Sequence, residues 1–163
     1  AALAASLAQA GRSREAAVLS VSPAEALGTL FNVMERGPKL IIGLGVRGDV
    51  RELEVNTEAT NWLSMRTAGE LPFYGSIEPG LPAALPLQSE WLTRVTREVT
   101  RLGEGLRLSP DAGMHACNLT FFNALLHAAA STRVLFIHVP PDIITRPRLR
   151  GLLQELVDVL AGP

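Results

Sequence analysis

The sequence holds a single cysteine, Cys117, in a setting that suits a nucleophile. It follows the turn-like segment Asp111–Gly113 and begins an apolar stretch that predicts a helix. The N-terminus of a helix presents free backbone N–H groups and positive partial charge, so we expect it to lower the pKa of the thiol. The same N–H groups could hold an oxyanion during acyl transfer. The alternative is an inert cysteine that fills a gap in the core.

His138 is the natural partner for this thiol. It lies near the end of the apolar segment Arg133–Val139, which predicts a buried strand that Pro140 and Pro141 must end. Ligands of open α/β sheets bind outside the C-terminal ends of strands, and a helix that follows a parallel strand begins at the same edge. We therefore expect Cys117 and His138 to meet at one rim, where His138 would take the thiol proton and pass it to a leaving amine. A satisfied core histidine is the competing interpretation.

The other histidines and the glycine-rich segment favour no second chemistry. His115 is only a local neighbour of Cys117, and His127 lies about three helical turns beyond it. No set of Cys, His and carboxylate residues has the spacing of metal ligands, so no metal site is expected. Residues 43–48 (GLGVRG) have the glycine spacing of a dinucleotide fingerprint, but an alternating segment follows instead of a helix. Nucleotide binding is therefore not expected.

Helices and apolar strands alternate along the chain, and this order predicts the fold class. We expect an α/β fold, a three-layer α/β/α sandwich with a mostly parallel central sheet, in a single domain over residues 1–163. Expected helices cover residues 1–11, 22–36, 89–102, 117–130 and 147–160, and expected strands cover residues 16–21, 39–44, 51–57, 106–109 and 133–139. The strand over 51–57 alternates and should be more exposed than the others. Residues 65–87, rich in Pro and Gly, predict a long loop.

Composition narrows the partners and the compartment. Fifteen Lys and Arg residues against sixteen Asp and Glu residues give a net charge of -1, which argues against nucleic acid or a membrane as a partner. No apolar run approaches the roughly 18–20 residues that span a bilayer. A single cysteine cannot form an internal disulfide, which favours a cytoplasmic location. The chain begins at Ala1 within an expected helix, so we expect further residues upstream.

Two segments resemble the pyroglutamyl peptidase I (pyrrolidone-carboxylate peptidase) family. Residues 109–118 (SPDAGMHACN) and the following Phe121-Phe122 resemble its nucleophile segment, and residues 136–140 (FIHVP) resemble its histidine segment. The resemblance implies a cysteine peptidase that removes N-terminal pyroglutamate from peptides by Cys–His chemistry, with a Glu as third member. It also implies no cofactor, assembly into a tetramer, and a first strand and loop that would precede Ala1.

The resemblance is weakest at the positions that would complete the site. Val46 stands where the family has a substrate-side Gln, and we expect Val46 and Ala116 to be substrate-binding positions. Asn56 aligns with the catalytic Glu, and Glu58 is the alternative partner for His138. An Asn can orient a catalytic histidine through its side-chain oxygen but supplies no negative charge. Two functions therefore stay open: an active peptidase that releases pyroglutamate, or an inactive family member that acts as a binding or scaffold protein.

Overall fold

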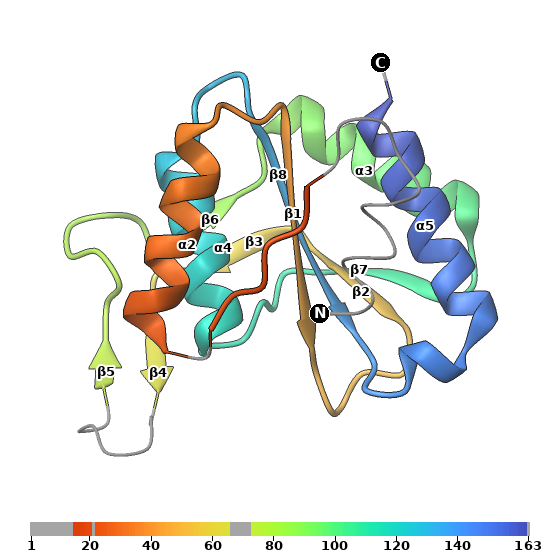
Figure 1. The fold of residues 1–163 in the computed structure, drawn as a ribbon, viewed down its shortest axis with the longest axis horizontal. Helices are drawn as coiled ribbons and strands as arrows, with labels where there is room; N and C mark the ends of the chain where they lie inside the picture. The colour runs from red at the N-terminus through yellow and green to blue at the C-terminus, as the bar shows by residue number, and fades with distance from the viewer. Residues whose placement is uncertain (1–14, 21, 66–72, 163) are drawn as a thin grey trace.

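A four-stranded sheet forms the centre of the computed structural model, which describes residues 15–20, 22–65 and 73–162 (Figure 1). Across the sheet the strands are β1 (Leu40–Val46), β8 (Arg133–Val139), β2 (Leu53–Asn56) and β7 (Leu106–Ser109). β1 is parallel to β8 and β2 is parallel to β7, whereas β2 and β8 are antiparallel. The central sheet is therefore mixed and mostly parallel, as expected.

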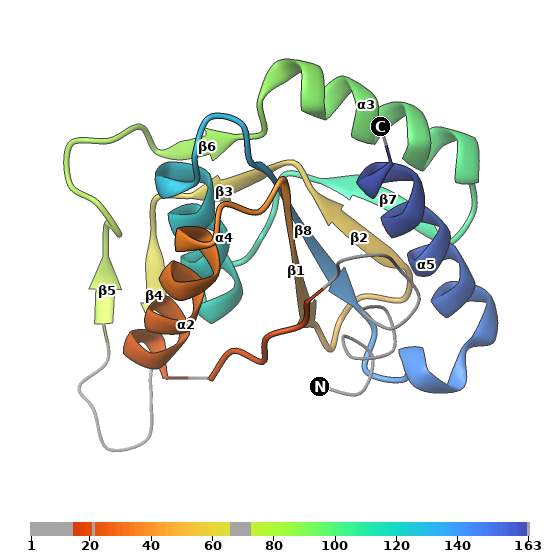
Figure 2. The same cartoon turned by 45° about the horizontal axis from the view of Figure 1, so that its top comes forward.

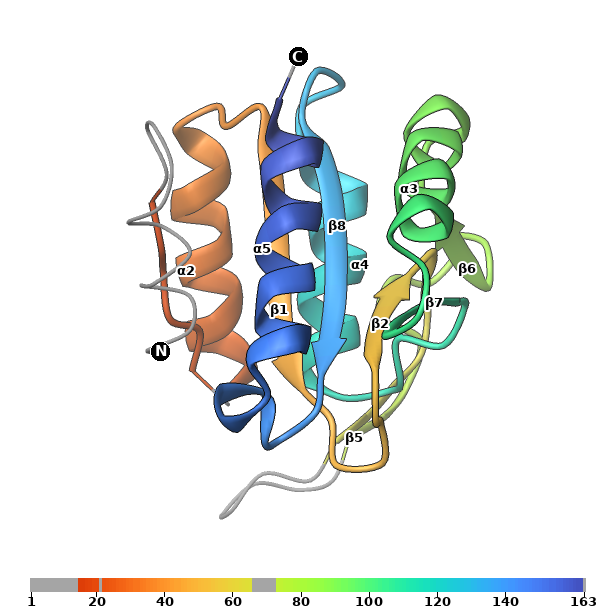
Figure 3. The ribbon, with the colours of Figure 1, turned by 90° about the vertical axis from the view of Figure 1, so that its right-hand side faces the viewer.

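Helices cover both faces of this sheet. α2 (Pro23–Glu35) and α4 (Ala116–His127) lie on one side, and α3 (Ser89–Leu102) and α5 (Pro147–Ala161) lie on the other (Figure 1). The view turned by 90° looks onto the α5 side, with α5 in front of β8 and α4 behind it (Figure 3). The short 3-10 helix η1 (Ile143–Thr145) connects β8 to α5. The expected three-layer α/β/α sandwich is confirmed.

Apolar spacing explains why these elements form where they do. β8 is buried at every position after its first, and α3 buries Trp91, Val95 and Val99 along one side, as an amphipathic helix requires. α2 begins at Pro23, one residue after the expected start, and no side-chain hydrogen bond caps it. It ends before Gly37, whose φ of 64° is the left-handed conformation that glycine adopts at helix ends.

Two small sheets carry the chain onward from β2. β3 (Glu58–Thr60) pairs antiparallel with β6 (Ala84–Pro86), and β4 (Leu63–Met65) pairs antiparallel with β5 (Phe73–Gly75) (Figure 2). The expected loop over residues 65–87 therefore contains two strands in its described part. These strands have only three residues each, because Pro and Gly interrupt the segment repeatedly.

Two expected strands differ from the structure. Residues 15–20 form no strand, so the strand expected over 16–21 is wrong in its described part. β2 is shorter than expected and buried at all four positions, because it lies in the middle of the sheet between β8 and β7. Its alternation separates an apolar buried face from a polar buried face, and the expected exposure is wrong. The helix expected over residues 1–11 lies outside the described residues.

Candidate active site

Cys117 is the second residue of α4, and its sulfur lies against strand β1. A Cβ atom on Gly45 would lie 2.7 Å from Cys117 Sγ, so the glycine leaves room for the thiol. Gly45 pairs in register with His138 of the parallel strand β8. Register partners point to the same face of a sheet, so the imidazole of His138 lies on the α4 face, beside the position that the thiol covers. The thiol and the imidazole therefore share one face near the C-terminal end of β8.

The lengths of α4 and β8 explain why Cys117 and His138 lie at the same level. α4 packs against β1 and β8, and residues 128–132 turn the chain from the end of the helix into β8. From Cys117 to His127 the helix advances about 15 Å, and from Arg133 to His138 the strand returns about 17 Å. The two distances nearly cancel, so the strand brings His138 back to the level of Cys117.

The reason that the sequence suggested for this meeting is wrong. β7, the strand before α4, is parallel to β2 and therefore runs opposite to β8. Its C-terminal end points toward the N-terminal end of β8, away from His138. Residues 110–115 bring the chain back before α4 begins. The juxtaposition thus comes from the antiparallel α4–β8 connection and not from two parallel strands that end at one rim.

Asn56 of β2 holds the imidazole of His138 in one orientation. Its Oδ1 lies 2.8 Å from His138 Nδ1, and its Nδ2 donates a 2.8 Å hydrogen bond to the backbone oxygen of Asp111. Because a carbonyl oxygen can only accept, Nδ2 must face Asp111 and Oδ1 must face the imidazole. In neutral His138 the proton therefore sits on Nδ1, and Nε2 carries the lone pair that can accept a proton.

The two candidate partners of His138 have different places. Asn56 makes the hydrogen bond to Nδ1, whereas Glu58 opens β3 in a separate sheet, where it lies opposite Pro86. The chain has left the central sheet at this point, so the face shared by alternate residues of β2 does not continue to Glu58. The geometry favours Asn56 as the residue that orients the imidazole.

The two expected substrate-binding positions are chain neighbours of the residues that meet at the thiol, Gly45 and Cys117. Val46 follows Gly45 at the end of β1, and 66% of its surface is exposed. Ala116 precedes Cys117 as the first residue of α4. A role for either residue in binding a substrate stays a prediction.

Burial keeps both reactive groups neutral near pH 7. Burial raises the pKa of the Cys117 thiol above its ordinary value, more strongly than a backbone hydrogen bond and the charge of Arg47 lower it. Burial also lowers the pKa of His138, as does Arg47, while Glu54 and Asp111 raise it. The expected lowering of the thiol pKa at the helix N-terminus is therefore wrong, because desolvation outweighs it. A neutral thiol beside a neutral imidazole suits proton transfer during attack rather than a resting ion pair.

Three charged residues near His138 are missing from the sequence-based expectations. Glu54 is buried, lies opposite His138 across β2 and β8, and forms ion pairs with Arg47 (3.2 Å) and Arg107. Arg47 also forms an ion pair with Asp111 at 2.9 Å. The sequence signal that could have indicated them is the alternation of β2, which places Glu54 among buried residues. A buried carboxylate needs cationic partners from elsewhere in the chain.

Several solved structures with this fold are described as pyrrolidone carboxyl peptidases or pyroglutamyl peptidases. A pyrrolidone carboxyl peptidase from Thermus thermophilus is 27% identical, with 98% of this chain and 88% of that chain covered at a TM-score of 0.77. Pyroglutamyl peptidase I from Bacillus amyloliquefaciens is 21% identical, with 98% and 83% covered at 0.73. A mutant pyrrolidone carboxyl peptidase from Pyrococcus furiosus is 21% identical, with 98% and 86% covered at 0.77. The chain therefore has the fold of the pyrrolidone carboxyl peptidases, at low sequence identity to them.

The divergence is large at the level of sequence. No family model matches the chain, and no curated protein is similar enough to count as a match. The likeness to pyrrolidone carboxyl peptidases therefore resides in the arrangement of elements.

Within this pyrrolidone carboxyl peptidase fold, a buried amide fixes the start of α4. Asn118 accepts a hydrogen bond from Thr60 N (2.9 Å) and donates to the backbone oxygens of Thr60 (2.8 Å) and Trp62 (3.0 Å). On the same side, His115 Nδ1 lies 2.5 Å from the backbone oxygen of Ser64, so it must donate its proton there. The segment from β3 to β4 is thus fastened to the residues that flank Cys117.

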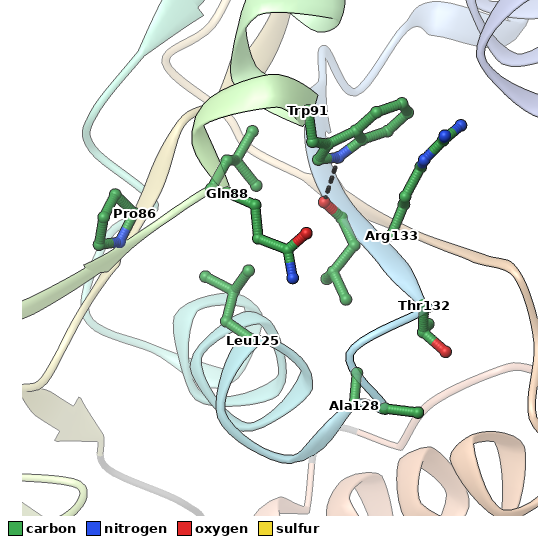
Figure 4. Close-up of a pocket in the computed structure, with 10 residues that line it drawn as sticks. Pro86, Gln88, Trp91, Leu125, Ala128, Thr132 and Arg133 are labelled. Carbon is green, nitrogen blue, oxygen red and sulfur yellow. Dashed lines mark hydrogen bonds between the residues drawn. The ribbon is translucent and has the colours of Figure 1, made fainter.

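A cavity at the opposite end of β8 does not belong to this site. It lies between α3, the end of α4 and the start of β8, where Trp91 Nε1 donates to the backbone oxygen of Val134 at 2.8 Å (Figure 4). Its volume of about 60 Å³ is far below the roughly 300–1,000 Å³ of typical small-molecule sites. This cavity is therefore too small to be the candidate site, which rests on the placement of Cys117 and His138.

Other kinds of site find little support in the part of the chain that the structure describes. There, no three His, Cys, Asp or Glu side chains are grouped so that they could hold a metal ion. No helix in this part is long and apolar enough to cross a membrane. His127, at the far end of α4 from Cys117, packs edge-on against Phe31 with ring centroids 5.7 Å apart.

Proposed function

We propose that the chain is a cysteine peptidase that removes N-terminal pyroglutamate from peptides, with Cys117 as nucleophile and His138 as base. The observation that carries the proposal is the thiol over Gly45, the register partner of His138. The peptidase fold of the solved relatives supports the substrate class. The proposed reaction uses only side-chain groups, backbone groups and water.

The reaction begins from the neutral pair. His138 Nε2 takes the thiol proton as Cys117 Sγ attacks the pyroglutamyl carbonyl carbon. Free N–H groups at the start of α4, where Ala116 and Cys117 lie, stabilise the charge on the carbonyl oxygen. His138 then gives its proton to the leaving amine, and the shortened peptide departs from a thioester. Water, deprotonated by His138, hydrolyses this thioester and restores the thiol.

Orientation and charge come from different residues in this proposal. Asn56 orients His138 through Nδ1 but carries no charge. Glu54 and Asp111 supply negative charge near the imidazolium, and each raises the pKa of His138. Arg47 opposes them. This division replaces the carboxylate that the resembling family uses as its third member.

On the substrate side, Val46 stands where the resembling family has a Gln, and a role for it in substrate binding stays a prediction. The paired strands β4 and β5 form part of the wall of the proposed substrate site. Ser64 of β4 is bound to the loop before α4, because its N–H donates to Met114 O (2.7 Å) and its carbonyl accepts from His115. A pyroglutamyl peptide is the proposed partner. Tetrameric assembly and a cytoplasmic location stay predictions.

A second candidate function is an inactive binding or scaffold protein. Two observations favour it: burial raises the pKa of the Cys117 thiol, and an amide instead of a carboxylate meets His138. Both would slow catalysis, but neither prevents proton transfer from a thiol to a neutral imidazole. The paired placement of the two groups therefore favours the enzyme.

The two functions are separated by an assay with a pyroglutamyl-linked fluorogenic amide on the full-length protein. We expect release of the fluorophore by the native sequence, and loss of release in Cys117→Ala and in His138→Ala. His127→Ala is the matched control, because this histidine packs against Phe31 at the other end of α4. A folded native protein without turnover would leave the scaffold function.

A further inference from the structure

Arg47 joins three parts of the chain around the candidate dyad. It follows β1, and its guanidinium binds Asp49 in the next turn (2.9 Å) and Glu54 on β2 (3.2 Å). It also binds Asp111 twice, through the carboxylate (2.9 Å) and the backbone oxygen (3.0 Å). Only the planar fork of an arginine can make such a set of directed bonds, since an ammonium is a point charge.

Asp111 is the point where these bonds reach the nucleophile segment. Its backbone oxygen accepts from both Arg47 and Asn56, and its Oδ1 accepts from the N–H of Gly113 at 2.8 Å. Gly113 has a φ of 76°, so the carboxylate stabilises a turn that only glycine adopts easily. This turn leads directly to α4 and Cys117.

The same contacts reach His138 from the other side. Asn56 bonds to Asp111 with one end of its amide and to His138 with the other. Glu54, the cross-strand neighbour of His138, shares Arg47 with Asp111. The nucleophile loop and the imidazole are therefore fixed to one guanidinium.

We propose that Arg47 is a positioning residue, which fastens the loop before Cys117 to the strand ends that hold Asn56 and His138. The role rests on the proposed function, because it concerns the geometry of that dyad. Its physical basis is broader, since the contacts order the loop whether or not a substrate is turned over. The charge of Arg47 acts as well, because it lowers the pKa of both the Cys117 thiol and His138.

The test compares Arg47→Gln, which removes the charge and the fork, with Arg47→Lys, which keeps the charge alone. Two measurements need no turnover: hydrogen exchange of the backbone around Gly113, and the pH dependence of Cys117 alkylation by iodoacetamide. For Arg47→Gln we expect faster exchange in this loop and alkylation that is about three- to tenfold slower at mildly alkaline pH. Arg47→Lys should restore the alkylation profile but not the slow exchange. If Arg47 had only a structural role, Arg47→Lys would not restore the alkylation of Cys117 while leaving hydrogen exchange near Gly113 fast.

The control is Arg101→Gln on α3, which removes an arginine with two carboxylate partners, Glu98 and Glu155, away from the dyad. It should change neither readout. If Arg47→Gln fails to fold, Asp111→Asn removes the same ion pair and should speed loop exchange in its place. Exchange and alkylation at native values in the Arg47 variants, or in Asp111→Asn, would overturn the proposal.

Activity toward the pyroglutamyl amide then tests the consequence for catalysis. We expect Arg47→Gln to lower kcat with little change in KM, since the residue orders the dyad and does not face the substrate. Loss of slow exchange without any turnover by the native protein would support the positioning role and contradict the proposed function. The failures of the two proposals are therefore distinguishable.

Discussion

The hydrogen bond between Asn56 and His138 decides what the candidate base can do. The amide selects the tautomer with the proton on Nδ1, because its own N–H group is committed to Asp111. This selection leaves Nε2 basic without the charge of a carboxylate. Charge comes instead from Glu54 and Asp111, which do not bond to the imidazole directly. The proposed catalysis therefore relies on orientation of the imidazole more than on a strong ion pair.

Replacing Asn56 with Ala should therefore lower kcat by about 10²-fold with little effect on KM, because His138 loses its orientation. Glu58→Gln should have a far smaller effect, since Glu58 lies in the sheet of β3 and β6. Steady-state kinetics on the fluorogenic amide measure both. Equal losses in the two variants would contradict the assignment of Asn56.

The pH profile should report two neutral groups. Activity needs His138 unprotonated, and its pKa is lowered from 6.5, so the acid limb of kcat/KM should have its midpoint below pH 6.5. The pKa of the Cys117 thiol is raised from 9.0, so no loss from thiol ionisation should occur below that pH. Rates recorded between about pH 5 and 10 give both limbs. An acid midpoint above 6.5 would show that the imidazole is not buried as described.

At the scale of the elements, β1 contributes to the site through two glycines, which have no side chain. Its glycines let side chains from other elements lie flat on the strand: Phe136 over Gly43, and Cys117 over Gly45. A glycine pattern that superficially suggested phosphate binding therefore has a packing role. The helix α4 can approach the sheet closely enough for the sulfur of its second residue to lie against Gly45, the register partner of His138.

Gly45→Ala should disturb this approach. The added methyl would lie 2.7 Å from Cys117 Sγ and 3.0 Å from the ring of Phe136, so we expect a loss of roughly 1–3 kcal/mol in the free energy of unfolding. Denaturant unfolding measures the loss, and iodoacetamide reports the displaced thiol. Gly48→Ala is the matched control, with no atom within 4 Å of the new methyl. A stability loss as large in the control would refute the close-contact explanation.

At the scale of the whole molecule, Asn118 connects α4 to the small sheets. It is fully buried, and its amide bonds to the backbone at Thr60 and Trp62. The central sheet positions the imidazole, whereas the hydrogen bonds of Asn118 fix the N-terminal end of α4, which carries the thiol. The two halves of the site therefore rely on different parts of the fold.

Asn118→Ala should cost roughly 2–4 kcal/mol of unfolding free energy, because it removes three hydrogen bonds that the buried amide makes to the backbone of Thr60 and Trp62. Asn123→Ala should cost less, since Asn123 bonds only within α4, to the backbone oxygen of Leu119. Thermal and denaturant unfolding of the two variants give the comparison. Similar losses would mean that the connection to the small sheets contributes little.

The sequence was sufficient for the fold class and for most elements of the central sandwich, because their apolar spacing is regular. It was insufficient wherever the answer depended on distant partners. The burial of β2 follows from its place between two other strands, and the contacts of Glu54 follow from arginines far along the chain. Residues 106–109 were expected as a strand, but their direction relative to β8 cannot be read from the local pattern. The raised thiol pKa likewise reflects surroundings that no short segment encodes.

The α4–β8 connection has a consequence for partly opened states of the protein. Cys117 and His138 are only 21 positions apart in the sequence, whereas Asn56 and His138 are 82 positions apart. Closing the longer loop costs about 1 kcal/mol more in chain entropy. The sulfur and the imidazole are thus brought together by a short loop of the chain. The tautomer of the imidazole, by contrast, depends on a residue that is distant in sequence. Local opening around β2 would separate Asn56 from His138 and free the imidazole to take either tautomer, while the short α4–β8 connection would still keep the thiol near it.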